Sequence, residues 1–144
     1  QAVILPNLAA GCSMADMANL AKVERCWREL NSVLNADEVF TPVTYINSAA
    51  DLKAFCGRHG GIVCTSSNAG TIAEWSFRQR EKILFFPDQH LGRNTAKSMD
   101  VPLEQMPLWN PRKPLGGASA DELRAAVLRI IADGSGVHIN DGVL

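Results

Sequence analysis

The stretch 82-KILFFPDQHLGRNTA-96 contains the unit from which most of this chain is built. Residues 82–86 form a strand-length run that is apolar after its first lysine, and a helical pattern begins at Leu91 behind the polar segment 87–90. Strands that are apolar at successive positions are typical of parallel sheets buried on both faces. The stretch therefore predicts a buried β-strand, a polar strand exit and an α-helix, in that order.

The same unit recurs along the chain, with apolar runs of strand length alternating with helical patterns. This alternation predicts an α/β fold in which helices cover both faces of a short parallel sheet, a three-layer α/β/α, Rossmann-like domain. The predicted strands are Val3–Leu5, Phe40–Ile46, Ile62–Thr65, Lys82–Phe86 and Met106–Trp109. The predicted helices are Met14–Leu34, Ala49–His59, Ala69–Arg80, Leu91–Met99 and Ala120–Ala132.

The composition argues against several classes of protein. The chain has 144 residues, enough for one domain, and 47% of them are hydrophobic and 20% charged. A net charge of -1 offers no electrostatic basis for binding nucleic acid or a membrane surface. No apolar run approaches the roughly 20 residues of a membrane-spanning helix. The four cysteines form no C-x-x-C pair, which favours reduced thiols in the cytoplasm over disulfides or a zinc site.

Helix-capping signals support the predicted boundaries. Asn47 or Ser48 is a candidate cap for the helix at 49–59. Ser119 and Glu122 have the spacing of a capping box at the start of the last predicted helix.

Three strand exits in succession carry polar side chains, at 45–48, 65–70 and 87–92. In open α/β sheets, ligands bind outside the carboxyl ends of the strands, where helix N-termini present unpaired N–H groups. Tyr45 and Asn47 lie two residues apart on a strand, so their side chains project to the same side. The pair suits a proton donor beside an amide that orients a polar ligand, although a half-buried tyrosine is more often a packing residue.

The run 65-TSSN-68 precedes the helix predicted at 69–80, so its hydroxyls and the helix N–H groups suit a phosphate or a carboxylate. A set of redundant N-cap residues explains the same run equally well. Asp88 and His90 suit an acid–base pair, but a helix cap at Asp88 and a packing role for His90 explain them at least as well. His138 lies in a tail for which the sequence predicts no element.

Among the thiols, Cys12 alone has a loop position beside a glycine, in 5-LPNLAAGCSMADM-17, just before a predicted helix. Such a position lowers a thiol pKa and favours the thiolate that binds iron or attacks carbon. Position alone leaves a functional and a structural role for Cys12 equally open. Cys26 and Cys56 fall within helical patterns and Cys64 within an apolar strand, so these three are predicted to be structural residues.

Four motifs occur in the order found in the quinolinate synthase family of iron–sulfur enzymes in NAD biosynthesis, which this chain resembles. The Cys12 motif resembles the family's first cluster-cysteine motif, and the resemblance extends over residues 1 to about 125. The other three motifs are 43-VTYINSAADLKAF-55, 58-RHGGIVCTSSNA-69 and 82-KILFFPDQHLGRNTA-96. The segment 106-MPLWNPRKPLGG-117 resembles the family's loop after its next strand.

The resemblance implies three similar α/β domains around a central active site, each supplying one cysteine to a [4Fe-4S] cluster whose open iron acts as a Lewis acid. It also implies a reaction, the condensation of iminoaspartate with dihydroxyacetone phosphate to quinolinate, with loss of phosphate and water. By the same resemblance, Cys12 is a cluster ligand, Tyr45 is catalytic, and Asn47 and Ser66 bind substrate.

The chain departs from the family pattern at both ends. No cysteine follows Cys64, so the other two cluster ligands are absent, and a substrate-binding segment expected ahead of the first motif is missing. We therefore expect a central fragment: 1–36 as the end of a first α/β domain, with its strand, the Cys12 loop and a connecting helix, 37–132 as a second α/β domain, and 133–144 as a divergent tail. We expect the isolated chain to be inactive and its partners to be the missing flanking domains or further copies of itself. The alternative is a non-enzymatic Rossmann-like module that binds a small phosphate or carboxylate.

Overall fold

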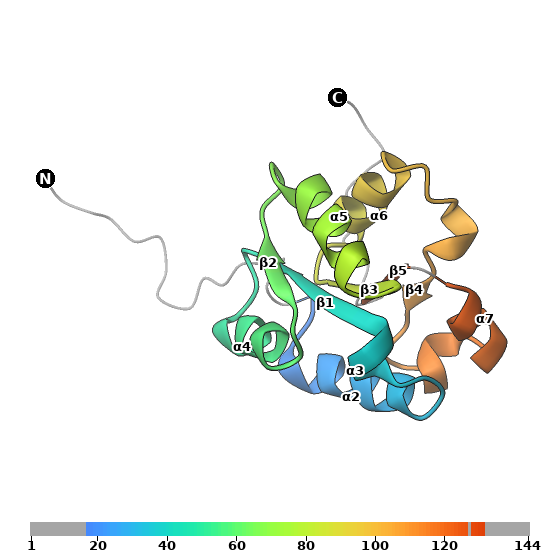
Figure 1. Ribbon diagram of the computed structural model, residues 1–144. Helices are drawn as coiled ribbons and strands as arrows, with labels where there is room; N and C mark the ends of the chain where they lie inside the picture. The colour runs from blue at the N-terminus through green and yellow to red at the C-terminus, as the bar shows by residue number, and fades with distance from the viewer. Residues whose placement is uncertain (1–16, 127, 132–144) are drawn as a thin grey trace, which may run out of the picture.

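The computed structural model describes residues 17–126 and 128–131 and contains one five-stranded sheet (Figure 1). The strand order is β2-β1-β3-β5-β4, and each neighbouring pair is parallel. The predicted parallel sheet is therefore confirmed. The strands are β1 (Phe40–Tyr45), β2 (Ile62–Cys64), β3 (Lys82–Phe86), β4 (Leu108–Trp109) and β5 (Leu128–Ile131).

Helices cover both faces of this sheet, which confirms the three-layer α/β/α arrangement (Figure 1). α2 and α4 pack on one face, while α5 and α6 pack on the other. No helix of the described residues is long and apolar enough to cross a membrane. The α-helices are α2 (Leu20–Asn31), α3 (Ala36–Val39), α4 (Ala50–Arg58), α5 (Ala69–Gln79), α6 (Gln89–Lys97) and α7 (Ala120–Ala125). Two short 3-10 helices are η1 (Leu103–Gln105) and η2 (Pro114–Gly117).

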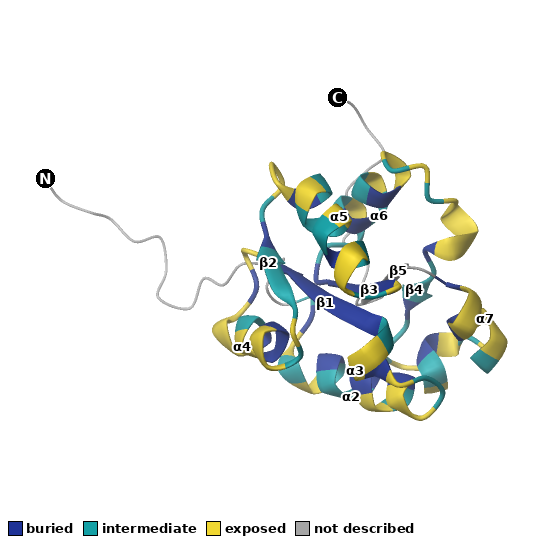
Figure 2. Cartoon of the chain, viewed as in Figure 1, coloured by how far each residue is buried: buried dark blue, intermediate teal, exposed yellow. Residues whose placement is uncertain are grey.

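The apolar run of β3 is explained by its place between β1 and β5. Successive side chains of a strand point to opposite faces. Ile83 and Phe85 accordingly pack under α5 and α6, while Leu84 and Phe86 pack under α2 and α4. Because both faces are covered, each position after the first must be apolar, and all five residues of the strand are buried (Figure 2).

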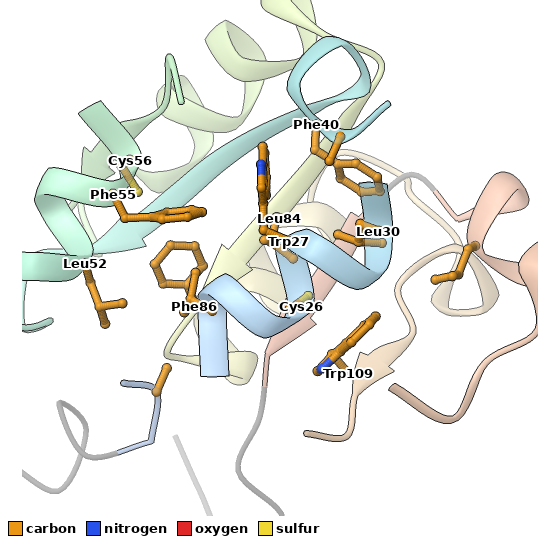
Figure 3. Packing of buried hydrophobic residues seen from close by; sticks show 14 residues of the cluster. Cys26, Trp27, Leu30, Phe40, Leu52, Phe55, Cys56, Leu84, Phe86 and Trp109 are labelled. Carbon is orange, nitrogen blue, oxygen red and sulfur yellow. The ribbon is translucent and has the colours of Figure 1, made fainter. Parts of the chain in front are cut away.

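The larger core lies on the α2 and α4 face and is rich in aromatic rings (Figure 3). Phe55 is central: its ring centroid lies 5.5 Å from that of Trp27 and 6.3 Å from that of Phe86, in edge-to-face geometry. Burying each large apolar side chain stabilises the fold by about 1.5–3 kcal/mol. This core therefore attaches α2 firmly to the sheet.

The predicted C-terminal helix Ala120–Ala132 is wrong in its second half. Its capping box is confirmed, since the hydroxyl of Ser119 accepts from the N–H of Glu122 and the Glu122 carboxylate accepts from the N–H of Ser119. However, α7 ends at Ala125, the chain becomes extended at Ala126, and β5 follows. A short apolar run suits a strand or a helix by periodicity alone, and here pairing with β3 on one side and β4 on the other selects the strand.

Several boundaries also differ from the predicted ones. α2 begins at Leu20 because the side chain of Asn19 caps it, accepting from the N–H of Lys22 at 3.0 Å. Neither Asn47 nor Ser48 caps α4, whose N-cap position is Ala49 and carries no side-chain hydrogen bond. The short helix α3 was not predicted. The predicted strand Val3–Leu5 and the tail 133–144 lie outside the described residues, and the domain boundary after residue 36 stays a prediction.

Candidate functional site

The carboxyl ends of β1, β2 and β3 lie next to one another at one edge of the sheet. Tyr45 is in register with Cys64, and Thr44 is in register with Phe86. The N–H of Ile46 donates to the carbonyl of Cys64 at 2.8 Å, which extends the β1–β2 pairing just past the end of β1. The polar exits of three strands are thus brought to one surface, as the parallel arrangement requires.

Tyr45 is the last residue of β1 and is half-buried. Its side chain packs against the core on the α5 and α6 face, beside Val43 and Cys64. The following turn is closed by the N–H of Ser48, which donates to the carbonyl of Tyr45 at 3.0 Å. Asn47 lies in this turn and is exposed. The turn therefore places an amide in solvent directly beside the end of the tyrosine strand.

The run at 65–68 forms a turn that closes on itself. The side-chain oxygen of Asn68 accepts from the N–H of Thr65 at 2.7 Å, and the hydroxyls of Thr65 and Ser67 lie 3.0 Å apart. Because Asn68 bonds back into the turn, it does not cap α5. Of the two interpretations of this run, the one of redundant N-cap residues is therefore wrong for Asn68.

Ser66 lies at the exposed tip of this turn and makes no side-chain hydrogen bond with any residue that the structure describes. The first N–H groups of α5 follow it and receive no side-chain cap. Such groups carry a partial positive charge and suit an anion. Ser66 and the α5 N-terminus thus offer uncommitted donors beside the exit of β1.

Asp88 and His90 have different surroundings at the neighbouring exit. One carboxylate oxygen of Asp88 accepts from the N–H of His90 at 2.8 Å and from the N–H of Leu91 at 3.1 Å, so Asp88 caps α6. This confirms the structural interpretation of Asp88. His90 is exposed and does not pack into the first turn of the helix as that interpretation had it.

The three described cysteines, Cys26, Cys56 and Cys64, are buried, and none of them forms a disulfide bond. Burial, together with the neighbouring Cys64 thiol, raises the pKa of Cys56 to about 12. Burial, together with the charge of Asp88, raises the pKa of Cys64 to about 11. Protonated thiols of this kind do not bind metal, and no group of three His, Cys, Asp or Glu residues in the described part of the chain could hold a metal ion. Cys12 lies outside the described residues.

A clamp between α2 and the loop after β4 was not predicted. One carboxylate oxygen of Glu29 accepts from Nε of Arg25 at 2.7 Å, and the other accepts from the N–H of Leu115 at 2.7 Å. Arg25 also donates to the carbonyl of Pro111 at 2.9 Å. The sequence shows the i,i+4 spacing of Arg25 and Glu29 but carries no signal for partners 86 residues away. The clamp fixes the loop that leaves β4 at the same edge as Tyr45.

Comparison with known proteins gives one consistent family. The family model described as quinolinate synthetase A protein matches residues 1–124. A quinolinate synthase of Corynebacterium glutamicum is 64% identical over 126 residues, which are 88% of this chain and 32% of the relative. One of Rhodopirellula baltica is 60% identical over 120 residues, 83% of this chain and 30% of the relative.

A third relative, the quinolinate synthase of Streptomyces coelicolor, is 52% identical over 139 residues, 96% of this chain and 35% of the relative. The chain thus spans about a third of the length of the curated relatives that it matches. No solved structure matches the chain significantly.

Proposed function

The chain belongs to the quinolinate synthetase A protein family, and from this premise we propose that it is a section of a quinolinate synthase that supplies part of the substrate-binding wall. The proposed reaction of the whole enzyme is the condensation of iminoaspartate with dihydroxyacetone phosphate to quinolinate, in cytoplasmic NAD biosynthesis. The observation that carries the proposal is the meeting of Tyr45 and the turn at 65–68 at one edge of the sheet.

Tyr45 is proposed as the catalytic residue of this section. Ring-forming condensation and dehydration require a proton donor beside the reacting atoms, and a phenol can donate and recover a proton. The half-buried ring is held by the core under α5, while its position at the end of β1 directs it to the edge where ligands bind. A fixed donor of this kind loses little entropy when substrate binds.

Asn47 and Ser66 are proposed to hold the anionic groups of the substrates. Both substrates carry carboxylate or phosphate groups, which require several hydrogen-bond donors. Asn47 offers an amide in the turn after β1, and Ser66 offers a hydroxyl directly ahead of the uncapped N-terminus of α5. Preorganised donors aimed at an anion stabilise the charge that it carries through the reaction.

An iron–sulfur cluster does not fit the donor set of the described residues, whose three thiols are buried, with the pKa of Cys56 and of Cys64 raised by that burial. Within this chain we propose Cys12 as the sole cluster ligand, with further thiolates supplied from outside these 144 residues by the flanking domains. The division at residue 36, between the end of a first α/β domain and a second one, is part of the same proposal.

The proposal is tested by ligand titration of the 144-residue chain, followed by the backbone amide signals in NMR spectra. Quinolinate and dihydroxyacetone phosphate are the probes. We expect weak but saturable shifts at Asn47, Ser66 and the first residues of α5. Asn47→Ala and Ser66→Ala should each weaken binding about three- to tenfold, the loss expected for one ordinary hydrogen bond at a solvent-exposed position.

Ser98→Ala is the matched control, because Ser98 is an exposed serine at the other end of the neighbouring helix α6. Its substitution should leave the binding of both probes unchanged. Shifts that never saturate, or that ignore Asn47→Ala and Ser66→Ala, would show that these strand exits are not a substrate wall.

A further inference from the structure

A second recess lies on the other side of α6, away from the exits of β1 and β2. It is a groove of about 510 Å³ between α6 and the segment that leads to β4. This volume is within the range of about 300–1,000 Å³ that is usual for small-molecule sites. We call it the α6 groove. It is lined by His90, Arg93, Asn94, Lys97, Asp100, Val101, Pro102, Leu103 and Met106.

One wall of the α6 groove is basic. His90, Arg93 and Lys97 follow one another at helical spacing along α6, and the helix contains no acidic residue that could pair with them. Some cations on other helices are paired within the same helix, as Arg25 is with Glu29 and Arg124 with Asp121. No ion pair within the described residues involves the three groups of the α6 groove.

The guanidinium group of Arg93 has an N–H group without an acceptor among the described residues. Its Nη2 donates to the carbonyl of Met106 at 3.2 Å, while its Nε is buried without a partner among the described residues. Burial also lowers the pKa of Arg93. A guanidinium carries five N–H donors in a fork that matches carboxylate and phosphate oxygens. The bond to Met106 holds this fork in place at the side of the groove.

The opposite wall is apolar. Val101 and Leu103 line it, and the side chain of Leu103 is 60% exposed, the more exposed of the two large apolar side chains that are exposed in the described part of the chain. A basic wall facing an apolar wall suits a ligand with an anionic head and a hydrocarbon body. Water can hydrogen-bond to the side chains of the basic wall, whereas contact between water and the apolar wall is unfavourable.

We propose that the α6 groove binds a small organic anion, a carboxylate or a phosphate monoester. Its head lies between Arg93 and Lys97, and its hydrocarbon body lies against Val101 and Leu103. Asp100 is the single acidic residue of the lining. The site is separate from the turns after β1 and β2, because none of its lining residues belongs to them, although His90 follows β3.

The test is a titration of the 144-residue chain with hexanoate and with hexyl phosphate, followed by backbone amide shifts. Inorganic phosphate and 1-hexanol serve as the head alone and the body alone. We expect saturable shifts at Arg93, Lys97 and Leu103 with at least one of the two hexyl anions, and binding at least fivefold weaker for both partial probes. The tighter of the two anions identifies the preferred head group.

Three variants sharpen the test. Lys97→Gln and Leu103→Ser change exposed side chains, so the fold should tolerate them, and each should weaken binding about three- to tenfold. Lys53→Gln removes a cation from α4 and should change nothing. Equal binding of 1-hexanol, shifts confined to the turns after β1 and β2, or binding that ignores Lys97→Gln and Leu103→Ser would overturn the proposal. Because quinolinate binding is read at Asn47 and Ser66, either proposal can fail while the other stands.

Discussion

The amino and carboxyl edges of the sheet are built in opposite ways. At the amino edge, cationic side chains donate hydrogen bonds to backbone carbonyls. Nη1 of Arg80 donates to the carbonyls of Phe40 and His59 at 2.9 and 2.8 Å. Lys82 donates to the carbonyls of Arg124 and Ala126 at 2.6 and 2.8 Å. At the carboxyl edge, the exposed side chains of Asn47 and Ser66 make no such bonds with described residues. The side-chain cations of the amino edge thus stabilise the fold, whereas the proposed ligand-binding side chains of the carboxyl edge bond to no described residue.

The largest expected effect is at the amino edge, where β2 begins against β1. A Cβ on Gly61 would lie 2.0 Å from the carbonyl oxygen of Pro42, and backbone cannot move aside as a flexible side chain can. We expect Gly61→Ala to lower the free energy of unfolding by about 3 kcal/mol or more, measured by urea denaturation. Gly57→Ala is the control, because nothing lies within 4 Å of its Cβ and alanine favours the helix by up to about 1 kcal/mol. Equal losses in the two variants would contradict the close approach of β2 to β1.

The next effect tests the buried cation of β3. Lys82→Met keeps the apolar stem but leaves the carbonyls of Arg124 and Ala126 without their donor. We expect the free energy of unfolding to fall by about 2 kcal/mol, the cost of unpairing buried polar groups. Lys53→Met on α4 should change it by less than about 0.5 kcal/mol. An unchanged or higher stability of Lys82→Met would mean that desolvation, which lowers the pKa of Lys82, costs as much as the two hydrogen bonds contribute.

The third prediction concerns pH and the two buried thiols near the carboxyl edge. The folded state raises the pKa of Cys64 to about 11 and that of Cys56 to about 12, from 9.0. Their contribution to stability is therefore complete below pH 9 and is lost as pH rises, because the unfolded chain releases protons that the folded chain keeps. By pH 10 each thiol should have lowered the free energy of unfolding by about 1 kcal/mol.

Lys82 has the opposite effect on the free energy of unfolding at alkaline pH. Because its pKa is lowered in the folded state, the unfolded chain keeps a proton that the folded chain releases, so its contribution to stability rises with pH. The thiol contribution is therefore read as a difference between the parent chain and Cys64→Ala. Urea denaturation at pH 8 and pH 10 should show a smaller loss of stability in the variant, by about 1 kcal/mol. Parallel losses in both proteins would show that Cys64 ionises as easily in the folded state as in the unfolded one.

The sequence predicted the parts of this molecule that depend on local pattern. The run 82–86 marks a strand because both faces of β3 are covered, and Ser119 marks a helix start because its partner Glu122 is three residues away. β5 was missed because its identity as a strand depends on pairing with β3 and β4, which no local pattern encodes. At the site, the position of Tyr45 at a strand end was predictable.

The cations of the amino edge were not predictable, because their acceptors are distant in sequence. In the sequence, Lys82 is simply the first residue of an apolar strand. Its hydrogen-bond acceptors, the carbonyls of Arg124 and Ala126, are more than 40 residues away along the chain and come close only in the folded protein. The same holds for Arg80, whose acceptor on Phe40 lies 40 residues earlier. The bonds of the amino edge therefore depend on the topology of the fold, whereas the residue types that we propose to bind ligands are visible in the sequence.

The smallest expected effects compare single hydroxyls at the two ends of β1. Thr41→Val removes a buried hydroxyl that donates to the carbonyl of Ser76 at 3.1 Å, and it should lower the free energy of unfolding by about 1 kcal/mol. Tyr45→Phe keeps the packed ring and removes a hydroxyl that bonds to no described residue, so the loss should stay below about 0.5 kcal/mol. Ser66→Ala should be equally mild. If Tyr45→Phe destabilised the chain as much as Thr41→Val, the Tyr45 hydroxyl would be a group that stabilises the fold. That result would contradict the proposal that the side chains at the carboxyl end of β1 are available to a ligand.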